Sequence, residues 1–158
     1  MEPDTADVNP SDEPLGAKRG HRLNKSKVHS EIRSIALNSP VTDVYRHSCC
    51  FERLPQFIES LINIQKIDDT HFWLTTSHSS GQRRIMLQIV LRVPERRIAW
   101  QASCSEFSQG VILFEPLTQN RTEITLKLRS TIEPAILTRA TRDYLINFKQ
   151  FVEQRRLL

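Results

Sequence analysis

The sequence predicts an α+β domain in which a curved antiparallel sheet of about seven strands packs against one long C-terminal helix. Three observations support this fold class. From residue 61 onward, β-rich segments follow one another between tight turns, which is typical of an antiparallel meander. Pro134 ends that series, and residues 135–158 then show a helical hydrophobic period. Such a helix can bury its apolar stripe only against the sheet.

Residues 1–26 are predicted to form a disordered tail, and the domain is expected to span residues 27–158. The tail is rich in charge, proline and glycine and holds almost no large apolar side chains. Such a segment buries too little surface to offset the entropy that ordering costs. The first strand is expected over residues 28–37, where β-branched residues recur in a rough alternation.

Two short helices are expected after this strand. Ser39 and Pro40 predict the start of the first, with Ser39 as its cap and VTDVYRHS as its body over residues 41–48. The second is expected in PQFIESL, opened by Pro55.

Six further strands complete the predicted sheet. They cover residues 61–67, 71–77, 83–93, 96–103, 106–116 and 121–132. Gly81 is expected at positive φ in one turn, and Glu95 and Arg96 are expected at the tip of another hairpin. Because Ile98 and Trp100 follow at two-residue spacing, the charges of VPERRIAW read as an exposed turn before a strand that enters the core.

The C-terminal helix is expected to present one apolar stripe to the sheet. Its predicted members are Ala140, Tyr144, Phe148, Phe151 and Val152, with Leu137 and Leu145 at the edges.

Composition and charge narrow the function classes. The net charge is +4, and no basic stripe interleaves with aromatic residues, so no nucleic-acid partner is expected. No apolar run reaches the roughly 18 residues of a membrane span, although transient membrane contact stays compatible with the sequence. The N-terminus has neither signal-peptide nor transit-peptide character, so a cytoplasmic location is expected.

The sequence carries no recognisable catalytic or metal-binding motif. Cys49, Cys50 and Cys104 match no zinc spacing and are expected to be buried free thiols. The histidines are scattered, and there is no Ser-His-Asp order, HExxH motif or phosphate-binding glycine loop. No catalytic residue, metal or cofactor is therefore assigned.

The inward faces of the strands and the helix supply candidate residues for a ligand cavity. Alternation and helical spacing select Trp73, Ile85, Leu87, Ile89, Trp100, Ile112, Phe114, Leu126, Tyr144 and Phe148. Trp73 and Tyr144 stand out because each carries a polar tip that needs a partner. The competing interpretation is that these side chains simply fill the core.

Six pieces of the sequence stand in a characteristic order. They are SPVTDVY at 39–45, FERLPQFIESL at 51–61, VPERRIAW at 93–100, GVILFEPL at 110–117, RTEITLKL at 121–128 and LINFKQFVE at 145–153. Together they resemble the START-like (SRPBCC) superfamily, in particular the polyketide cyclase/dehydrase branch that includes the coenzyme Q-binding START proteins. Ile85 departs from the pattern, because many relatives carry a tryptophan there.

This resemblance implies a helix-grip fold with an apolar cavity between sheet and helix. Our first hypothesis is non-catalytic binding or carriage of a hydrophobic small molecule, such as a lipid, an isoprenoid quinone or a polyketide-like ligand. The alternative is a cyclase or dehydratase, which needs polar groups in the cavity. Glu106, Arg84 and Arg97 would supply them only if the strand phases differ from those given above. A protein-interaction role for the tail is a third hypothesis, and the oligomeric state stays open.

Overall fold

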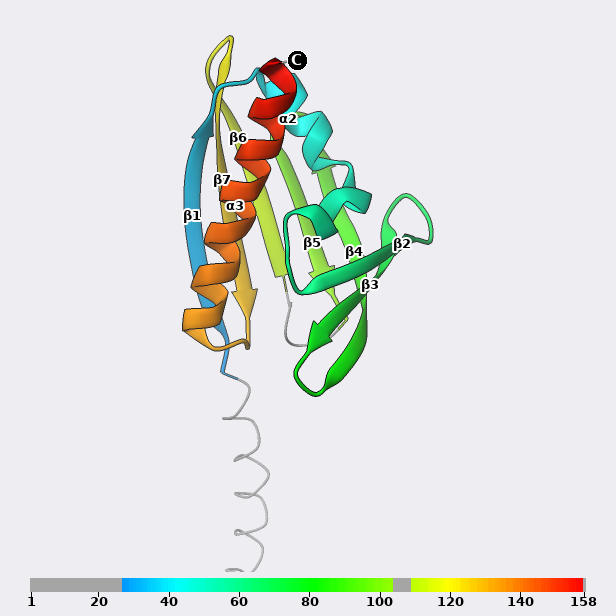
Figure 1. Ribbon diagram of the computed structural model, residues 1–158. Coiled ribbons are helices and arrows are strands. Elements are labelled where there is room, and N and C mark those ends of the chain that lie inside the picture. Colours follow the sequence, from blue (N-terminus) through cyan, green and yellow to red (C-terminus); the bar gives the residue numbers. More distant parts are fainter. Residues whose placement is uncertain (1–26, 104–108, 158) are drawn as a thin grey trace, which may run out of the picture.

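A strongly curved sheet wraps one long helix in the computed structural model, which describes residues 27–103 and 109–157 (Figure 1). The predicted tail and Cys104 lie outside the described residues. The elements are β1 (His29–Leu37), α2 (Val41–Ser48), η1 (Phe51–Gln56), β2 (Leu61–Lys66), β3 (His71–His78), β4 (Gly81–Val93), β5 (Arg97–Ala102), β6 (Gln109–Thr118), β7 (Arg121–Ser130) and α3 (Pro134–Leu157). The fold class predicted from the sequence is confirmed.

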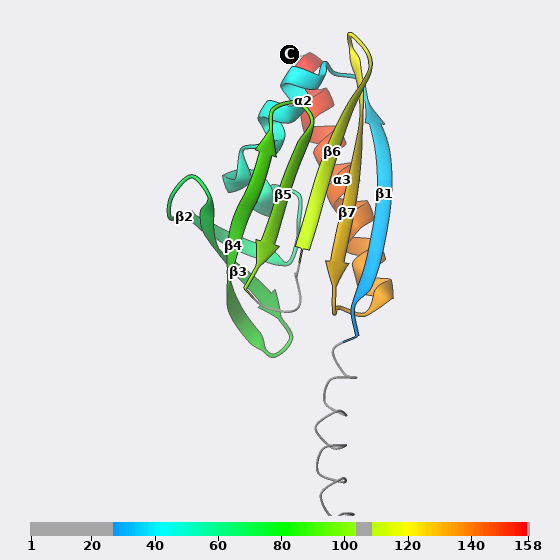
Figure 2. The same cartoon turned by 180° about the vertical axis from the view of Figure 1, so that it is seen from behind.

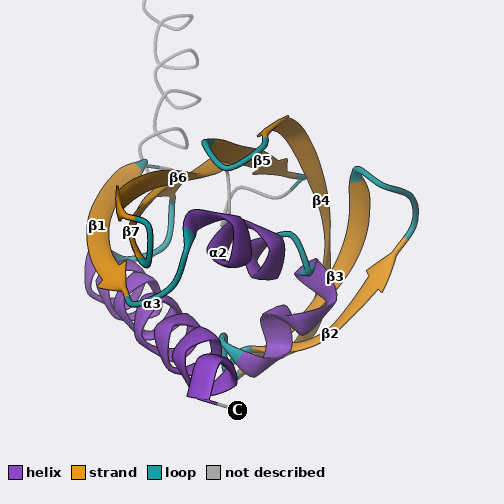
Figure 3. Cartoon of the chain, turned by 90° about the horizontal axis from the view of Figure 1, so that it is seen from above, coloured by secondary structure: helices purple, strands orange, loops and turns teal. Residues whose placement is uncertain are grey.

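The seven strands form one antiparallel sheet in the order β1-β7-β6-β5-β4-β3-β2. Strands β2 to β7 are the predicted meander, and β1 joins it by pairing with β7. Seen from above, the sheet curls so that α3 lies across the opening between its edges, while α2 lies over the interior at one end (Figure 3). We call this end, which also carries the turns after β4 and β6, the upper end (Figure 1). The opposite side of the sheet forms the outer face (Figure 2).

The alternating hydrophobicity of the strands produces the inner and outer faces. In β6 and β7 every second residue is buried, from Gly110 to Phe114 and from Thr122 to Leu126. In β4 the pairing register shifts between Ile89 and Leu91. Such a bulge bends a strand and increases its twist, which helps this sheet curl.

The two turns singled out in the sequence are present, and Gly81 has the expected positive φ. Gly81 has a φ of +123°, a backbone region that glycine enters without a steric penalty. Glu95 has a φ of 63°, which is unusual for a residue with a side chain. Its carboxylate accepts a hydrogen bond of 2.9 Å from the Thr42 hydroxyl, so the β4–β5 turn is tied to the first turn of α2.

The short helices differ in detail from the prediction. Ser39 does not cap α2: the side chain is fully buried, and Pro40 occupies the N-cap position without a side-chain hydrogen bond. The second short helix begins at Phe51, ahead of Pro55, and is a 3₁₀-helix. Pro55 stands inside this helix, and because it has no amide hydrogen it cannot take part in regular α-helical bonding there.

The apolar stripe of α3 is rotated slightly from the predicted one. Tyr144, Phe148 and Val152 are buried as expected, but Ala140 is exposed. Leu137 and Leu145, expected at the edges, are each only 3% exposed. The larger leucine side chains gain more from burial than alanine does, and the helix orients accordingly.

Candidate functional site

The inner face of the sheet and the facing stripe of α3 bring together all but one of the predicted cavity residues. Ile85, Leu87, Ile89, Ile112, Phe114, Leu126, Tyr144 and Phe148 belong to one buried cluster, and Trp100 packs against it. They come from β4, β5, β6, β7 and α3. That these residues hold a ligand stays a prediction, but the structure gives them a common location.

Trp73 is the residue that does not join this group. Its strand neighbours Phe72 and Leu74 are buried, so alternation turns Trp73 toward the outer face. There the guanidinium carbon of Arg84 lies 4.3 Å from the centre of the Trp73 ring, a cation–π contact. Trp73 is therefore corrected from a cavity candidate to a surface residue.

Packing along the inner face is uneven. Toward the upper end, Ile98, Ile112 and Ile124 are at most 4% exposed. Further down, Trp100 and Leu128 are only half-buried, although they share the same face. The lower part of the inner face is thus covered less completely by the rest of the described chain.

Trp100 lies against a glycine on the neighbouring strand. Gly110 pairs directly with Trp100, and a Cβ placed on Gly110 would come within 2.0 Å of the Trp100 indole. The missing side chain therefore makes the space that the indole occupies. Sequence reasoning overlooked this pair, although an isolated glycine inside a strand is a known sign of close approach.

Tyr144 brings a polar group into this apolar surface. Its side chain stacks on Phe148 with ring centroids 5.8 Å apart and meets Phe57 edge-on. Burial raises the pKa of the Tyr144 hydroxyl well above its usual value, so the group stays protonated. Among the described residues, none accepts a hydrogen bond from this hydroxyl, but it is not one of the fully buried unpartnered atoms, which are Ser39 Oγ and Arg53 Nη1.

Other hydroxyls on the inner side are already bonded to the backbone. The Thr141 hydroxyl donates to the Leu137 carbonyl at 2.8 Å, and the Thr76 hydroxyl donates to the Arg83 carbonyl at 3.4 Å. At the lower end, Glu31 accepts from Thr138 of α3 and pairs with Arg33 at 2.9 Å. This polar group ties β1 to α3 at the edge of the cluster.

The predicted polar alternatives are placed away from the inner face. Arg84 stacks on Trp73, and Arg97 lines a groove of about 760 Å³ near the β4–β5 turn, together with Glu115 and Glu123. Glu106 lies outside the described residues. Phe114 is the single predicted cavity residue that also borders this groove.

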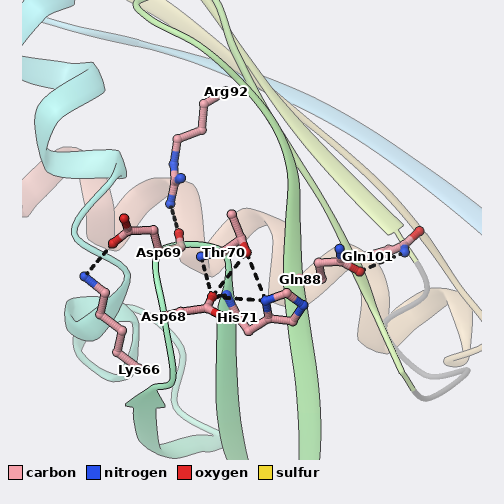
Figure 4. A network of polar contacts seen from close by, with 8 residues as sticks. All are labelled: Lys66, Asp68, Asp69, Thr70, His71, Gln88, Arg92 and Gln101. Carbon is pink, nitrogen blue, oxygen red and sulfur yellow. Dashed lines mark hydrogen bonds and ion pairs between the residues drawn. The ribbon is translucent and has the colours of Figure 1, made fainter.

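A polar network at the turn between β2 and β3 does not have the arrangement of a catalytic triad. One oxygen of Asp68 accepts bonds from the amides of Thr70 and His71 and lies 3.0 Å from His71 Nδ1 (Figure 4). The Thr70 hydroxyl lies 2.9 Å from the same Nδ1 atom, whereas a triad would place the carboxylate and the nucleophile on opposite nitrogens of the histidine ring. These bonds, first that from the Thr70 amide and then that from the His71 ring, lower the pKa of Asp68 to about 2.

The part of the chain that the structure describes holds no cluster of three or more potential metal ligands. Cys49 and Cys50 are free thiols, but they are only partly buried rather than buried as predicted, and this partial burial raises the pKa of Cys49. No helix within the described ranges has the length and apolar character needed to cross a membrane.

Comparisons with known proteins place the fold. No family model matches the chain. An uncharacterized 17.2 kDa protein of Streptomyces lincolnensis is 29% identical over 132 residues, covering 77% of this chain and 88% of that protein. The crystal structure of the Zhui aromatase/cyclase from a Streptomyces species matches with a TM-score of 0.69 and 11% identity, covering 82% of this chain and 96% of that one. A START superfamily protein from Mycobacterium smegmatis matches with a TM-score of 0.60 and 11% identity, covering 80% and 96%.

Proposed function

The chain has the helix-grip fold of START-like structures, and from this premise we propose that it binds or carries a hydrophobic small molecule between the inner face of the sheet and α3. The ligand class is a lipid, an isoprenoid quinone or a polyketide-like compound. The observation that carries the proposal is the Tyr144 hydroxyl, which has no acceptor among the described residues and belongs to a cluster of buried apolar side chains.

The chemistry of this surface selects a particular kind of ligand. Apolar walls favour an apolar body, at about 25 cal/mol per Å² of apolar area removed from water. The Tyr144 hydroxyl has no acceptor among the described residues, so a ligand that accepts its hydrogen bond would gain about 0.5–1.5 kcal/mol. Because Tyr144 stays protonated, its complement is an acceptor such as a carbonyl oxygen. Quinones, acyl lipids and polyketides all carry such oxygens on greasy frames.

The half-buried lower part of the inner face is where we place the ligand. Trp100 and Leu128 retain exposed surface there, whereas the upper part of the same face is closely packed. A guest in this position would complete the burial of Trp100. This gives the proposal an optical reporter.

The experiment combines extraction with fluorescence. Mass spectrometry of solvent extracts from the purified full-length chain should reveal a co-purified apolar compound. In the Trp73→Phe variant, whose single tryptophan is Trp100, a short-chain isoprenoid quinone should quench fluorescence to saturation. The matched Trp100→Phe variant retains only Trp73, on the outer face, and should not respond. Equal quenching in both variants, or no extract and no quenching, would reject the proposal.

A cyclase or dehydratase is the second candidate, and Tyr144 is the observation that favours it. A protonated phenol beside a substrate carbonyl could donate a hydrogen bond as negative charge develops on oxygen. Both roles use the same hydroxyl, so the two are separated by product analysis. If the extracted compound keeps its mass and absorption spectrum after prolonged incubation with the protein, the carrier role holds. A changed mass that depends on Tyr144 establishes the enzyme.

A further inference from the structure

Three helical segments meet beside the ring of Phe151, and each brings a basic group to it. His47 of α2 contacts the ring edge-on, with centroids 5.5 Å apart. The guanidinium carbon of Arg53 in η1 lies 5.2 Å from the centre of the ring, and that of Arg155 in α3 lies 4.4 Å from it. We call His47, Arg53 and Arg155 the cation cluster.

The two arginines of this cluster lack acidic partners. Within the described ranges, neither Arg53 nor Arg155 has a carboxylate at salt-bridge distance. Nη1 of Arg53 is buried and makes no hydrogen bond. Asp43 is an acid near His47, but its carboxylate pairs with Arg46 at 2.9 Å. The ring of Phe151 attracts each guanidinium, yet it does not cancel their mutual repulsion.

His47 records the resulting positive field. Its pKa is lowered, first by partial burial and then by the charges of Arg46, Arg53 and Arg155, while Asp43 raises it. The three arginines come from α2, η1 and α3, and all of them act on His47. Because Arg53 and Arg155 have no acidic partner among the described residues, an anion could balance their charge.

We propose that the cation cluster binds a phosphate-type oxyanion, either a free phosphate group or the phosphate of a lipid headgroup. Arginine presents forked donors that match the oxygens of such a group. A surface pocket of about 220 Å³ shares Phe151 with the cluster and is lined by the amide side chains of Gln56, Asn147, Gln150 and Gln154. These amides can donate further hydrogen bonds to the oxygens or to a group attached to them.

The helix dipole of α3 opposes an anion at this place, and its charge can be compared with that of the two arginines. Arg155 lies in the last turn of α3, where the helix dipole contributes roughly half a negative charge. The two guanidinium groups carry two full positive charges, so attraction prevails. The site is formed by residues of α2, η1 and α3, with none from the sheet, and does not depend on the proposed function.

The first test is a titration of the full chain with inorganic phosphate at constant ionic strength, balanced with sodium chloride. We expect saturable changes in the NMR signals of the His47 ring and of the Arg53 and Arg155 Nε–H groups. Bound anion should also raise the pKa of His47, because it offsets the field of the arginines. Phosphate should raise the melting temperature more than chloride does.

Substitutions in the cation cluster test which residues bind phosphate. Arg53→Gln and Arg155→Gln should each weaken phosphate binding by about tenfold, because each removes charge-assisted hydrogen bonds. The matched control is Arg139→Gln, which removes the same charge from an exposed position nearer the start of α3. It should leave phosphate affinity unchanged. Amide spectra of each variant verify that it is folded.

A vesicle assay separates the two sources of the anion. Sedimentation with phosphatidylcholine vesicles, with and without phosphatidic acid, shows whether a headgroup phosphate is bound from a membrane. Binding that requires phosphatidic acid, and that is lost in Arg53→Gln but kept in Arg139→Gln, assigns the headgroup. Binding of free phosphate alone assigns a soluble phosphate compound. The proposal is overturned if neither probe binds, or if Arg139→Gln weakens binding as much as the cluster variants do.

Discussion

Two regions of the helix-grip interior are built differently. Where η1 meets α3, Phe57 contacts Tyr144, Phe148 and Phe151 of α3 through ring centroids 5.3 to 6.0 Å apart, and it is only 4% exposed. Lower on the inner face, Trp100 and Leu128 are half-buried. Dense aromatic packing thus holds α3 against η1, while Trp100 and Leu128 are covered less completely. The difference separates a region that mainly stabilises the fold from the region where we propose that a ligand binds.

Replacing the aromatic centre should have the largest effect on stability. Phe57→Ala removes edge-to-face contacts with three α3 rings and opens a cavity, so we expect a loss of about 3–5 kcal/mol. Leu128→Ala, in the less covered region, should cost about 1–2 kcal/mol. Urea denaturation followed by circular dichroism measures both. Equal losses would contradict the distinction between the two regions.

Filling the space beside Gly110 should have the next largest effect on stability. Gly110→Ala places a methyl group where the Trp100 indole lies, so we expect a loss of about 1–3 kcal/mol and a shift in Trp100 emission. Trp100→Phe in the same chain should restore part of this stability, because the two side chains compete for one space. Additive losses in the double variant would argue against the contact.

Removing the Tyr144 hydroxyl should weaken ligand binding while hardly changing the stability of the fold. Tyr144→Phe keeps the ring and its stacking on Phe148, so the free energy of unfolding should change by less than about 1 kcal/mol. Affinity for a carbonyl-bearing quinone should fall by about tenfold, since the donor is lost. The Trp73→Phe background reports this by fluorescence. Undiminished affinity would remove Tyr144 from the proposed site.

The smallest effect should come from the polar link between α3 and β1. Glu153 accepts bonds of 2.8 Å from the Lys149 ammonium and from the Asn38 amide, and that ammonium also bonds the Ala36 carbonyl. Partial burial raises the pKa of Glu153, but these bonds outweigh it and the net pKa is lowered. A lowered native pKa stabilises the fold above the unfolded pKa, near 4.3, and this contribution is lost as pH falls through the native pKa.

Glu153→Gln should therefore cost about 0.5 kcal/mol at pH 7 and nothing near pH 3. Thermal unfolding of both chains at the two pH values provides the measurement. A difference that persists at the acidic pH would mean that the carboxylate charge is not the cause.

The local hydrophobic pattern was sufficient to predict the strands and α3, but it did not decide which face some side chains occupy. The run Phe72, Trp73, Leu74 is apolar throughout, so alternation alone does not decide which member faces inward. Pairing of β3 with β4 sets that phase and places Trp73 beside Arg84. Likewise, Ser39 has the chemistry of a cap, but the fold buries it, and its carbonyl accepts a bond from Thr122 far along the chain.

What the sequence by itself determined was the order of elements, the curved antiparallel sheet, the apolar stripe of α3 and an inner face nearly free of charge. These follow from periods of two and of three to four residues, which are properties of neighbouring positions. Only the tertiary structure decided that Trp100 lies on Gly110, that the Tyr144 hydroxyl has no acceptor among the described residues and that three cations meet at Phe151. Those features depend on contacts between distant segments, which no local period encodes.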